Sequence, residues 1–140
     1  MNAVFLLDTN VISETRKLRP HGAVTTWLRQ TPASALYMCA ATLGELQAGA
    51  ENARRQHPAQ AMVIEAWIDG LEGGFEILPV DTKVFRIWAK LLNGKPQDHL
   101  LDALIAATAV AHGLTVATRN VKDFTPFGVP ILNPFETPRA

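Results

Sequence analysis

The chain has 140 residues, of which 48% are hydrophobic and 19% charged, and this favours one globular domain spanning residues 1–140. Thirteen basic and thirteen acidic residues give zero net charge, which excludes a general polyanion binder, so nucleic acid would need a local basic patch or a metal ion. A single cysteine, Cys39, and no apolar run long enough to span a bilayer predict a cytoplasmic protein without disulfides or a membrane partner.

Apolar runs of strand length alternate with segments of helical periodicity, which is the pattern of βαβ units. Strands are predicted at residues 4–7, 35–39, 75–78, 115–117 and 129–132. The predicted helices are one around residues 24–28, one over 42–53, one from Pro58 to Gly73, one capped by Asp81 and closed at 93–94, and one capped by Asp98 and stopped by Gly113. We therefore expect a three-layer α/β/α domain with a central, mostly parallel sheet of about five strands.

Four acidic residues lie at the boundaries of these predicted elements: Asp8, Glu45, Asp102 and Asp123. Ligand sites of parallel α/β sheets form outside the carboxyl ends of the strands, where the strand order switches direction. The acids can meet there if the strands that end before Asp8 and at Thr118 are neighbours. Two carboxylates about 4 Å apart repel by roughly 4 kcal/mol at an effective dielectric of about 20, so such a cluster needs a cation or a shared proton. Oxygen ligands favour Mg²⁺ or Mn²⁺ over zinc, and this site predicts phosphodiester cleavage.

Each acid also has a structural explanation. Asp8 suits a helix N-cap, and Glu45 suits a capping box that begins at Thr42. Asp123 fits a turn. Asp102 is harder to explain in this way, because few positions on so apolar a helix face water. The joint pattern of the acids therefore carries more weight than any one of them.

Two other functions remain open. A phosphatase with Asp8 as the nucleophile usually has a second acid two residues later, where this chain has Asn10, and a catalytic lysine, for which Lys122 is a weak candidate. A catalytically silent binding module would not need all four acids. The histidines, including His99, show no metal-ligand spacing and are interpreted as solvated or packed side chains.

Five short segments occur in a fixed order along nearly the whole chain. They are LLDTNVISE at 6–14, TLGEL at 42–46, LDALIAATA at 101–109, VATRNVKDF at 116–124 and LNPF at 132–135. Each segment is short, but their order and spacing together are highly specific. They resemble the motifs of PIN-domain ribonucleases, in particular the VapC toxins of bacterial type II toxin–antitoxin pairs and their FitB-like branch.

The resemblance implies an enzyme that holds Mg²⁺ or Mn²⁺ and hydrolyses RNA phosphodiester bonds. Asp8 and Asp102 would be the principal metal ligands, and Glu45 and Asp123 would complete the acidic site. The supporting residues would be Thr9, Asn10, Thr118 and Asn120. Some relatives carry an acid at the position of Asn120, so its amide implies a weaker second metal site.

The resemblance also implies partners. Such toxins bind an RNA substrate, typically form homodimers, and are silenced by a cognate antitoxin in a larger complex. The antitoxin usually binds the promoter as well, so any contact with DNA would be indirect.

Overall fold

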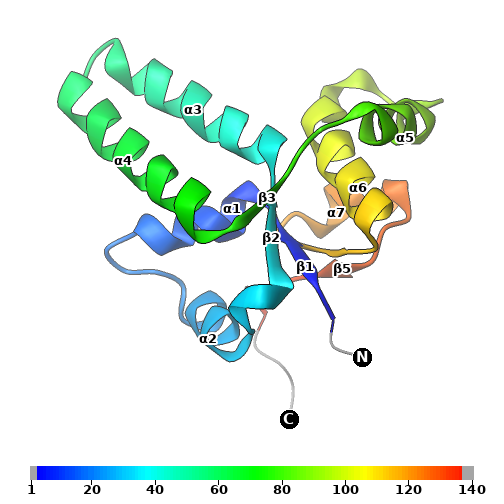
Figure 1. Ribbon diagram of the computed structural model, residues 1–140, viewed down its shortest axis with the longest axis horizontal. Coiled ribbons are helices and arrows are strands. Elements are labelled where there is room, and N and C mark those ends of the chain that lie inside the picture. Colours follow the sequence, from blue (N-terminus) through cyan, green and yellow to red (C-terminus); the bar gives the residue numbers. More distant parts are fainter. Residues whose placement is uncertain (1–2, 137–140) are drawn as a thin grey trace.

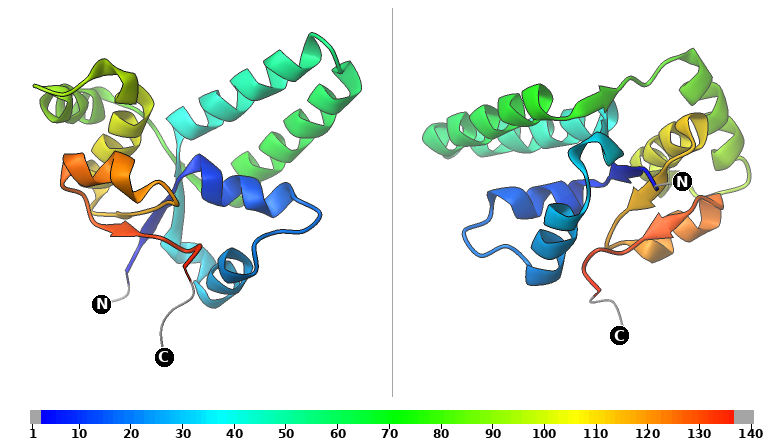
Figure 2. Two further views of the ribbon diagram at one scale, coloured as in Figure 1. Left: turned by 180° about the vertical axis from the view of Figure 1, so that it is seen from behind. Right: turned by 60° about the horizontal axis from the view of Figure 1, so that its bottom comes forward.

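Helices cover both faces of a central sheet in this protein, as Figures 1 and 2 show from three directions. The computed structural model describes residues 3–136, except for the side chain of Gln97, so both ends of the predicted 1–140 domain lie outside the described residues. The arrangement confirms the predicted α/β/α layers.

The sheet of the described residues contains five parallel strands. They are β1 (Phe5–Leu7), β2 (Leu36–Cys39), β3 (Glu76–Leu78), β4 (Thr115–Ala117) and β5 (Ile131–Leu132). The strand order is β3-β2-β1-β4-β5, so the sheet grows outward from β1 in one direction and then returns to add β4 on its other side. Leu7 lies opposite Ala117 in the register, so Asp8 and Thr118 leave the sheet side by side. This meets the condition under which the acids were expected to come together and places the switch point between β1 and β4.

Seven α-helices occur in the described part of the chain. They are α1 (Thr9–Ile12), α2 (Gly22–Gln30), α3 (Ala40–Arg54), α4 (Pro58–Gly74), α5 (Thr82–Leu92), α6 (Leu100–His112) and α7 (Val121–Phe124). Short 3₁₀ turns connect several of them: η1 (Ser13–Arg16), η2 (Ala33–Ala35), η3 (Gln97–His99) and η4 (Thr125–Phe127). Helices α3 and α4 form a hairpin that extends away from the sheet, and α5 packs on α6 (Figure 1).

Both faces of β1 are buried, which explains its uninterrupted apolar sequence. Successive strand residues point to opposite faces, so Leu6 and Leu7 enter different cores. Leu6 lies in one cluster with Ala106 of α6 and Phe124 of α7. Leu7 lies in the other cluster with Ile12 of α1 and Val24 of α2. Helices on both sides are therefore needed to cover this strand.

Two predicted helix ends are confirmed. The Asp81 carboxylate accepts a hydrogen bond from the Val84 amide at 3.0 Å and caps α5. Gly113 ends α6 with a φ of 67°, in the left-handed region that glycine adopts without a steric penalty.

Two other predicted caps are wrong. Helix α3 begins at Ala40, because β2 runs into it without a loop, so Thr42 lies inside the first turn. The buried Thr42 hydroxyl has no hydrogen-bond partner among residues 3–136, which rules out the capping box with Glu45. Asp98 does not cap α6, because residues 97–99 form η3 and His99 takes the N-cap position without a side-chain hydrogen bond.

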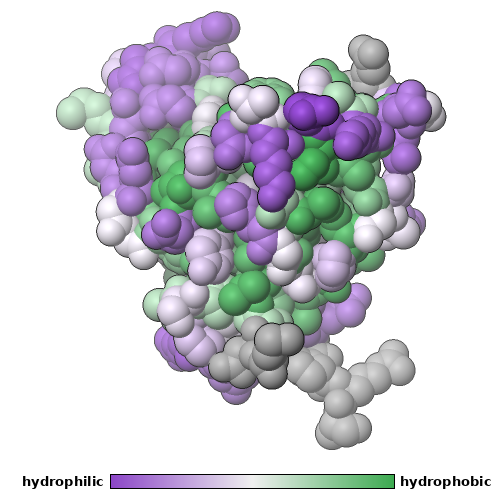
Figure 3. Space-filling view, turned by 45° about the vertical axis from the view of Figure 1, so that its right-hand side comes forward, coloured by the Kyte–Doolittle hydropathy of each residue, from purple (hydrophilic) through white to green (hydrophobic). Residues whose placement is uncertain are grey.

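Part of the surface is apolar. Figure 3 shows hydrophobic residues in the middle of the face on which α5 and α6 lie, with hydrophilic residues around them. Phe85 of α5 and Leu100 and Val110 of α6 are exposed. None of the helices within residues 3–136 has the length and hydrophobicity needed to cross a membrane.

Candidate functional site

Asp8 is fixed at the carboxyl end of β1. It caps α1, and its Oδ1 accepts a hydrogen bond from the Thr9 amide at 2.8 Å. Its Oδ2 accepts from the Thr118 hydroxyl at 2.7 Å and from the Asn10 amide group at 3.2 Å. The residue is only 4% exposed, so these contacts set the orientation of a buried carboxylate.

Burial raises the pKa of Asp8 above its ordinary value of 3.8. The hydrogen bonds from Thr118, Thr9 and Asn10 lower this pKa again, because they stabilise the charged form. The negative charge of Asp123 raises it further. Asp8 therefore keeps three hydrogen bonds, and within residues 3–136 no cationic side chain forms an ion pair with it.

Asp102 lies in the first turn of α6 and is half-buried. Burial, followed by the charges of Asp8 and Asp123, raises its pKa to about 6. His99, one turn earlier, opposes this shift, and its Nδ1 lies 3.6 Å from Asp102 Oδ2. Asp123 lies in the short helix α7 and not in a turn. The three aspartates thus lie within electrostatic reach of one another, although they come from three separate elements.

Glu45 joins this region through Thr9. It is exposed on α3, and its Oε2 accepts a hydrogen bond from the Thr9 hydroxyl at 2.9 Å. The Glu45 side chain thus contacts Thr9 of α1. It does not bind the backbone at the start of its own helix, as a capping box would require. Asp8 and Glu45 are therefore connected through Thr9, whose backbone amide donates to Asp8 and whose hydroxyl donates to Glu45.

Asn10 and Thr118 connect the ends of β1 and β4. The Asn10 amide group donates to Thr118 Oγ1 at 3.3 Å, and Asn10 Oδ1 accepts from the Arg119 backbone amide at 3.0 Å. Thr118 Oγ1 also accepts from the Asn120 backbone amide at 2.9 Å. Of the predicted supporting residues, Asn120 thus enters the network through its main chain.

The donor set suits a hard cation. All four acids offer carboxylate oxygens, which Mg²⁺ and Mn²⁺ prefer. Within residues 3–136, however, no three acidic, histidine or cysteine side chains are placed to hold one ion together. Mg²⁺ typically binds through one or two carboxylates and keeps several waters, so the residues fit an ion of that kind without a closed protein cage.

Two neighbours of the acids were not predicted as site residues. His99 contacts Asp102, and the only signal in the sequence was their separation by three helical positions. Arg119 follows Thr118 directly, and its guanidinium carbon lies 4.1 Å from the centroid of the Phe135 ring. No spacing rule connects Arg119 with Phe135, because they meet only through the fold.

Comparisons with known proteins agree with this geometry. Residues 5–125 match the family model described as PIN domain. VapC ribonuclease Y4jK from Sinorhizobium fredii is 37% identical to this chain, over 95% of this chain and 99% of the relative. Toxin FitB from Neisseria gonorrhoeae is 34% identical, over 94% and 99% respectively.

Solved structures show the same similarity. The crystal structure of FitAcB from Neisseria gonorrhoeae superposes with a TM-score of 0.83 at 34% identity and covers 96% of this chain and 100% of that chain. FitAB bound to a DNA fragment superposes with a TM-score of 0.76 at 32% identity, over 97% and 99%. The chain belongs to the PIN-domain family. Its relatives place it in the VapC branch that includes FitB.

Proposed function

We propose that this protein is a divalent-metal-dependent endoribonuclease and the toxin of a type II toxin–antitoxin pair. The observation that carries the proposal is the placement of Asp8, Asp102 and Asp123 within electrostatic reach of one another near the switch point of a PIN-domain sheet. Repelling carboxylates at this position are most simply stabilised by a cation. Relatives named as ribonucleases support RNA as the substrate.

The acids would divide the work of binding the ion. Asp8 and Asp102 would be the principal ligands of Mg²⁺ or Mn²⁺, with Glu45 and Asp123 completing the site. A bound ion supplies a nucleophilic water near neutral pH and offsets negative charge on the phosphate oxygens. Thr118 fixes the orientation of Asp8 by its hydrogen bond to Oδ2, and Oδ1, like any carboxylate oxygen with one such bond, still has a lone pair for an ion.

The supporting residues would position the acids and the substrate. Thr9 holds Glu45 by its hydroxyl, and Asn10 holds both Asp8 and Thr118. Asn120 is exposed beside the site, where its amide provides no additional negative charge for a second ion. The phosphatase alternative usually has a second acid at the position of Asn10. Here the Asn10 amide group donates a hydrogen bond to Asp8, which an ionised acid could not do, and this difference disfavours a phosphatase.

The partners follow from the same proposal. We infer one PIN domain that acts in the cytoplasm, forms a homodimer, and is silenced by an antitoxin that mediates any contact with DNA. The similar structures of FitAB with a DNA fragment and of DNA-bound VapBC support an antitoxin of this kind. The exposed apolar residues of α5 and α6 offer a surface for a partner chain. Light scattering on the purified protein would give the oligomeric state.

The decisive experiment removes one carboxylate charge at a time. Asp8→Asn and Asp102→Asn should each reduce Mg²⁺-dependent cleavage of a transcript pool by at least about a hundredfold, measured by sequencing the new RNA ends. Asp69→Asn is the matched control, since Asp69 is exposed on α4. Undiminished cleavage by both site variants would refute the proposal.

Glu45→Gln tests the fourth acid separately. Because Glu45 caps no helix, the exchange should lower cleavage without lowering stability. A protein that neither cleaves the pool nor binds Mn²⁺ in calorimetry would instead be a silent binding module. A phosphorylated Asp8 trapped on incubation with a phosphate ester would indicate a phosphatase.

A further inference from the structure

Arg119 is held at the edge of the acidic site by its backbone. It follows Thr118, whose hydroxyl donates to Asp8, and its own amide donates to Asn10 Oδ1 at 3.0 Å. Arg119 is therefore the next residue in the chain after a direct hydrogen-bond partner of Asp8. Its position is fixed by the same contacts that connect β1 to β4.

The Arg119 side chain is also held, but within residues 3–136 its N–H groups make no hydrogen bond. The guanidinium carbon lies 4.1 Å from the centroid of the Phe135 ring, a cation–π contact. Buried Glu14 is near enough to feel its charge, but the Glu14 oxygens already accept from the Lys17 ammonium and the His21 amide. Among residues 3–136, the exposed Arg119 guanidinium has no ion-pair or hydrogen-bond partner. Within the described residues, the ring of Phe135 thus orients the guanidinium, and no carboxylate forms an ion pair with it.

A surface hollow lies beside this side chain. Its volume is about 370 Å³, and its lining includes Arg119, Asn120, Lys122, Asp123 and Asn133. The hollow has two cationic residues together with one carboxylate of the acidic site. A second hollow, of about 400 Å³ between α2 and residues 132–136, is mainly apolar and contains none of the four acids. A further hollow, on α5, is lined by Lys83, Arg86 and Lys90 but by none of the four acids. The hollow at Arg119 is the one that joins cationic side chains to the acidic site.

The acidic site needs such cationic groups. Its carboxylates repel a polyanion, and the chain has no net positive charge that would attract one. We infer that Arg119 binds a backbone phosphate of the RNA next to the phosphodiester that is cleaved, which makes it a substrate-positioning residue. This inference rests on the proposed ribonuclease function. A guanidinium suits this role because its planar fork can donate two parallel hydrogen bonds to one phosphate.

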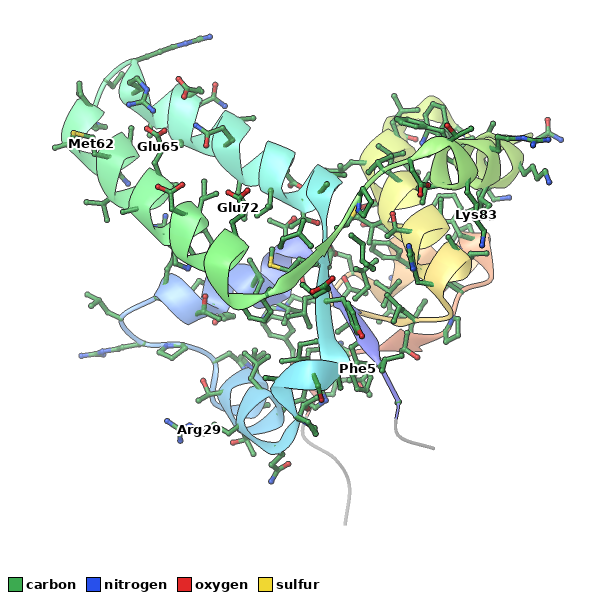
Figure 4. All side chains as sticks on the ribbon, viewed as in Figure 1. Phe5, Arg29, Met62, Glu65, Glu72 and Lys83 are labelled. Carbon is green, nitrogen blue, oxygen red and sulfur yellow. The ribbon has the colours of Figure 1, made fainter. Side chains whose placement is uncertain are left out.

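The test compares three variants in RNA cleavage. Arg119→Gln should raise KM about tenfold while kcat stays within about twofold, and it should reduce the slope of log KM against log salt by about 0.7, the value for one phosphate contact with a single strand. Arg119→Lys should keep most of the salt slope and recover part of the KM. Arg29→Gln is the matched control, because Arg29 points into solvent from α2, well away from the first turns of α3 and α6 (Figure 4).

The possible outcomes separate this inference from the function on which it rests. If the unmodified protein does not cleave RNA, the ribonuclease proposal itself fails. If it does cleave RNA, and Arg119→Gln leaves both KM and the salt slope unchanged, only the inference is overturned, and Arg119 is then a structural or partner-protein contact. Phe135→Leu tests the cation–π contact separately, since it keeps the charge of Arg119 but removes the aromatic ring. A smaller rise in KM with an unchanged salt slope is expected for this variant.

Discussion

At Asp8, the residue that caps α1 is also the proposed metal ligand. One of its oxygens satisfies the first amide of α1, while the other accepts from Thr118 and Asn10. The N-cap position is also the end of β1, where the sheet opens to ligands. The helix-cap contact of this aspartate is therefore compatible with its proposed role as a metal ligand.

Removing the hydroxyl of Thr118 should disturb Asp8 selectively. In Thr118→Val, Asp8 Oδ2 loses its shortest hydrogen bond and the Asn120 amide loses its acceptor. The pKa of Asp8 should rise further, RNA cleavage at neutral pH should fall about tenfold, and the free energy of unfolding should fall by about 1–3 kcal/mol. Cleavage assays and urea denaturation measure these effects. Thr118→Ser should restore both quantities, and equal behaviour of the Val and Ser variants would contradict the role of the hydroxyl.

Asp102 should make the metal-free protein less stable as the pH rises. Its pKa is about 6 in the folded protein and 3.8 ordinarily, so the folded state retains a proton that the unfolded chain releases between these values. Stability therefore falls across this window and stays lower above it. In EDTA at pH 7, Asp102→Asn should be more stable than the unmodified protein by about 1–3 kcal/mol, with little difference at pH 4. Equal urea midpoints at pH 7 would contradict this expectation.

The sequence predicted the acidic residues better than their contacts. Each acid was visible because it lies at the boundary of a predicted element, and the adjacency of the strands before Asp8 and Thr118 was stated as the condition for their meeting. The contact of Glu45 with Thr9 and the stacking of Arg119 on Phe135 could not be predicted. These pairs are far apart in the chain, and their side-chain directions depend on how the helices leave the sheet.

Helix ends were predictable where one residue type has a unique conformational role. Gly113 and Asp81 are such residues, and both were located correctly. The start of α3 was not, since β2 passes into the helix through Cys39 and Ala40, neither of which forms a side-chain cap. Thr42 was the nearest residue with a capping side chain, so the predicted start of the helix lies two residues after the observed start at Ala40.

Two glycine substitutions should have opposite effects on stability. Gly113→Ala should lower the free energy of unfolding by about 1–2 kcal/mol, because the residue has a φ of 67°. Gly49→Ala should raise it by up to about 1 kcal/mol, because Gly49 lies inside α3. No neighbouring atom lies within 4 Å of an added Cβ at either position, so the backbone alone decides the sign. Chemical denaturation of both variants measures the difference, and a shared sign would refute it.

The whole molecule should be stabilised by the ion that it is proposed to bind. An ion at about 100 times its dissociation constant adds about 2.7 kcal/mol to the free energy of unfolding, so Mg²⁺ or Mn²⁺ should raise the melting temperature by several degrees relative to EDTA. Asp102→Asn should abolish most of this rise, while Asp69→Asn should retain it. Sodium chloride at matched ionic strength controls for screening. An equal rise in the Asp102 variant would argue against ion binding at this site.

The position of β4 beside β1 also has a consequence for biosynthesis. Asp8 depends on Thr118, which lies 110 positions later, and Asp123 follows later still. A polypeptide growing on the ribosome exposes its first acid early, but it cannot close the centre of the sheet until most of the chain has been translated. We therefore expect nascent chains to be inert, with ribonuclease activity appearing only when synthesis is nearly finished.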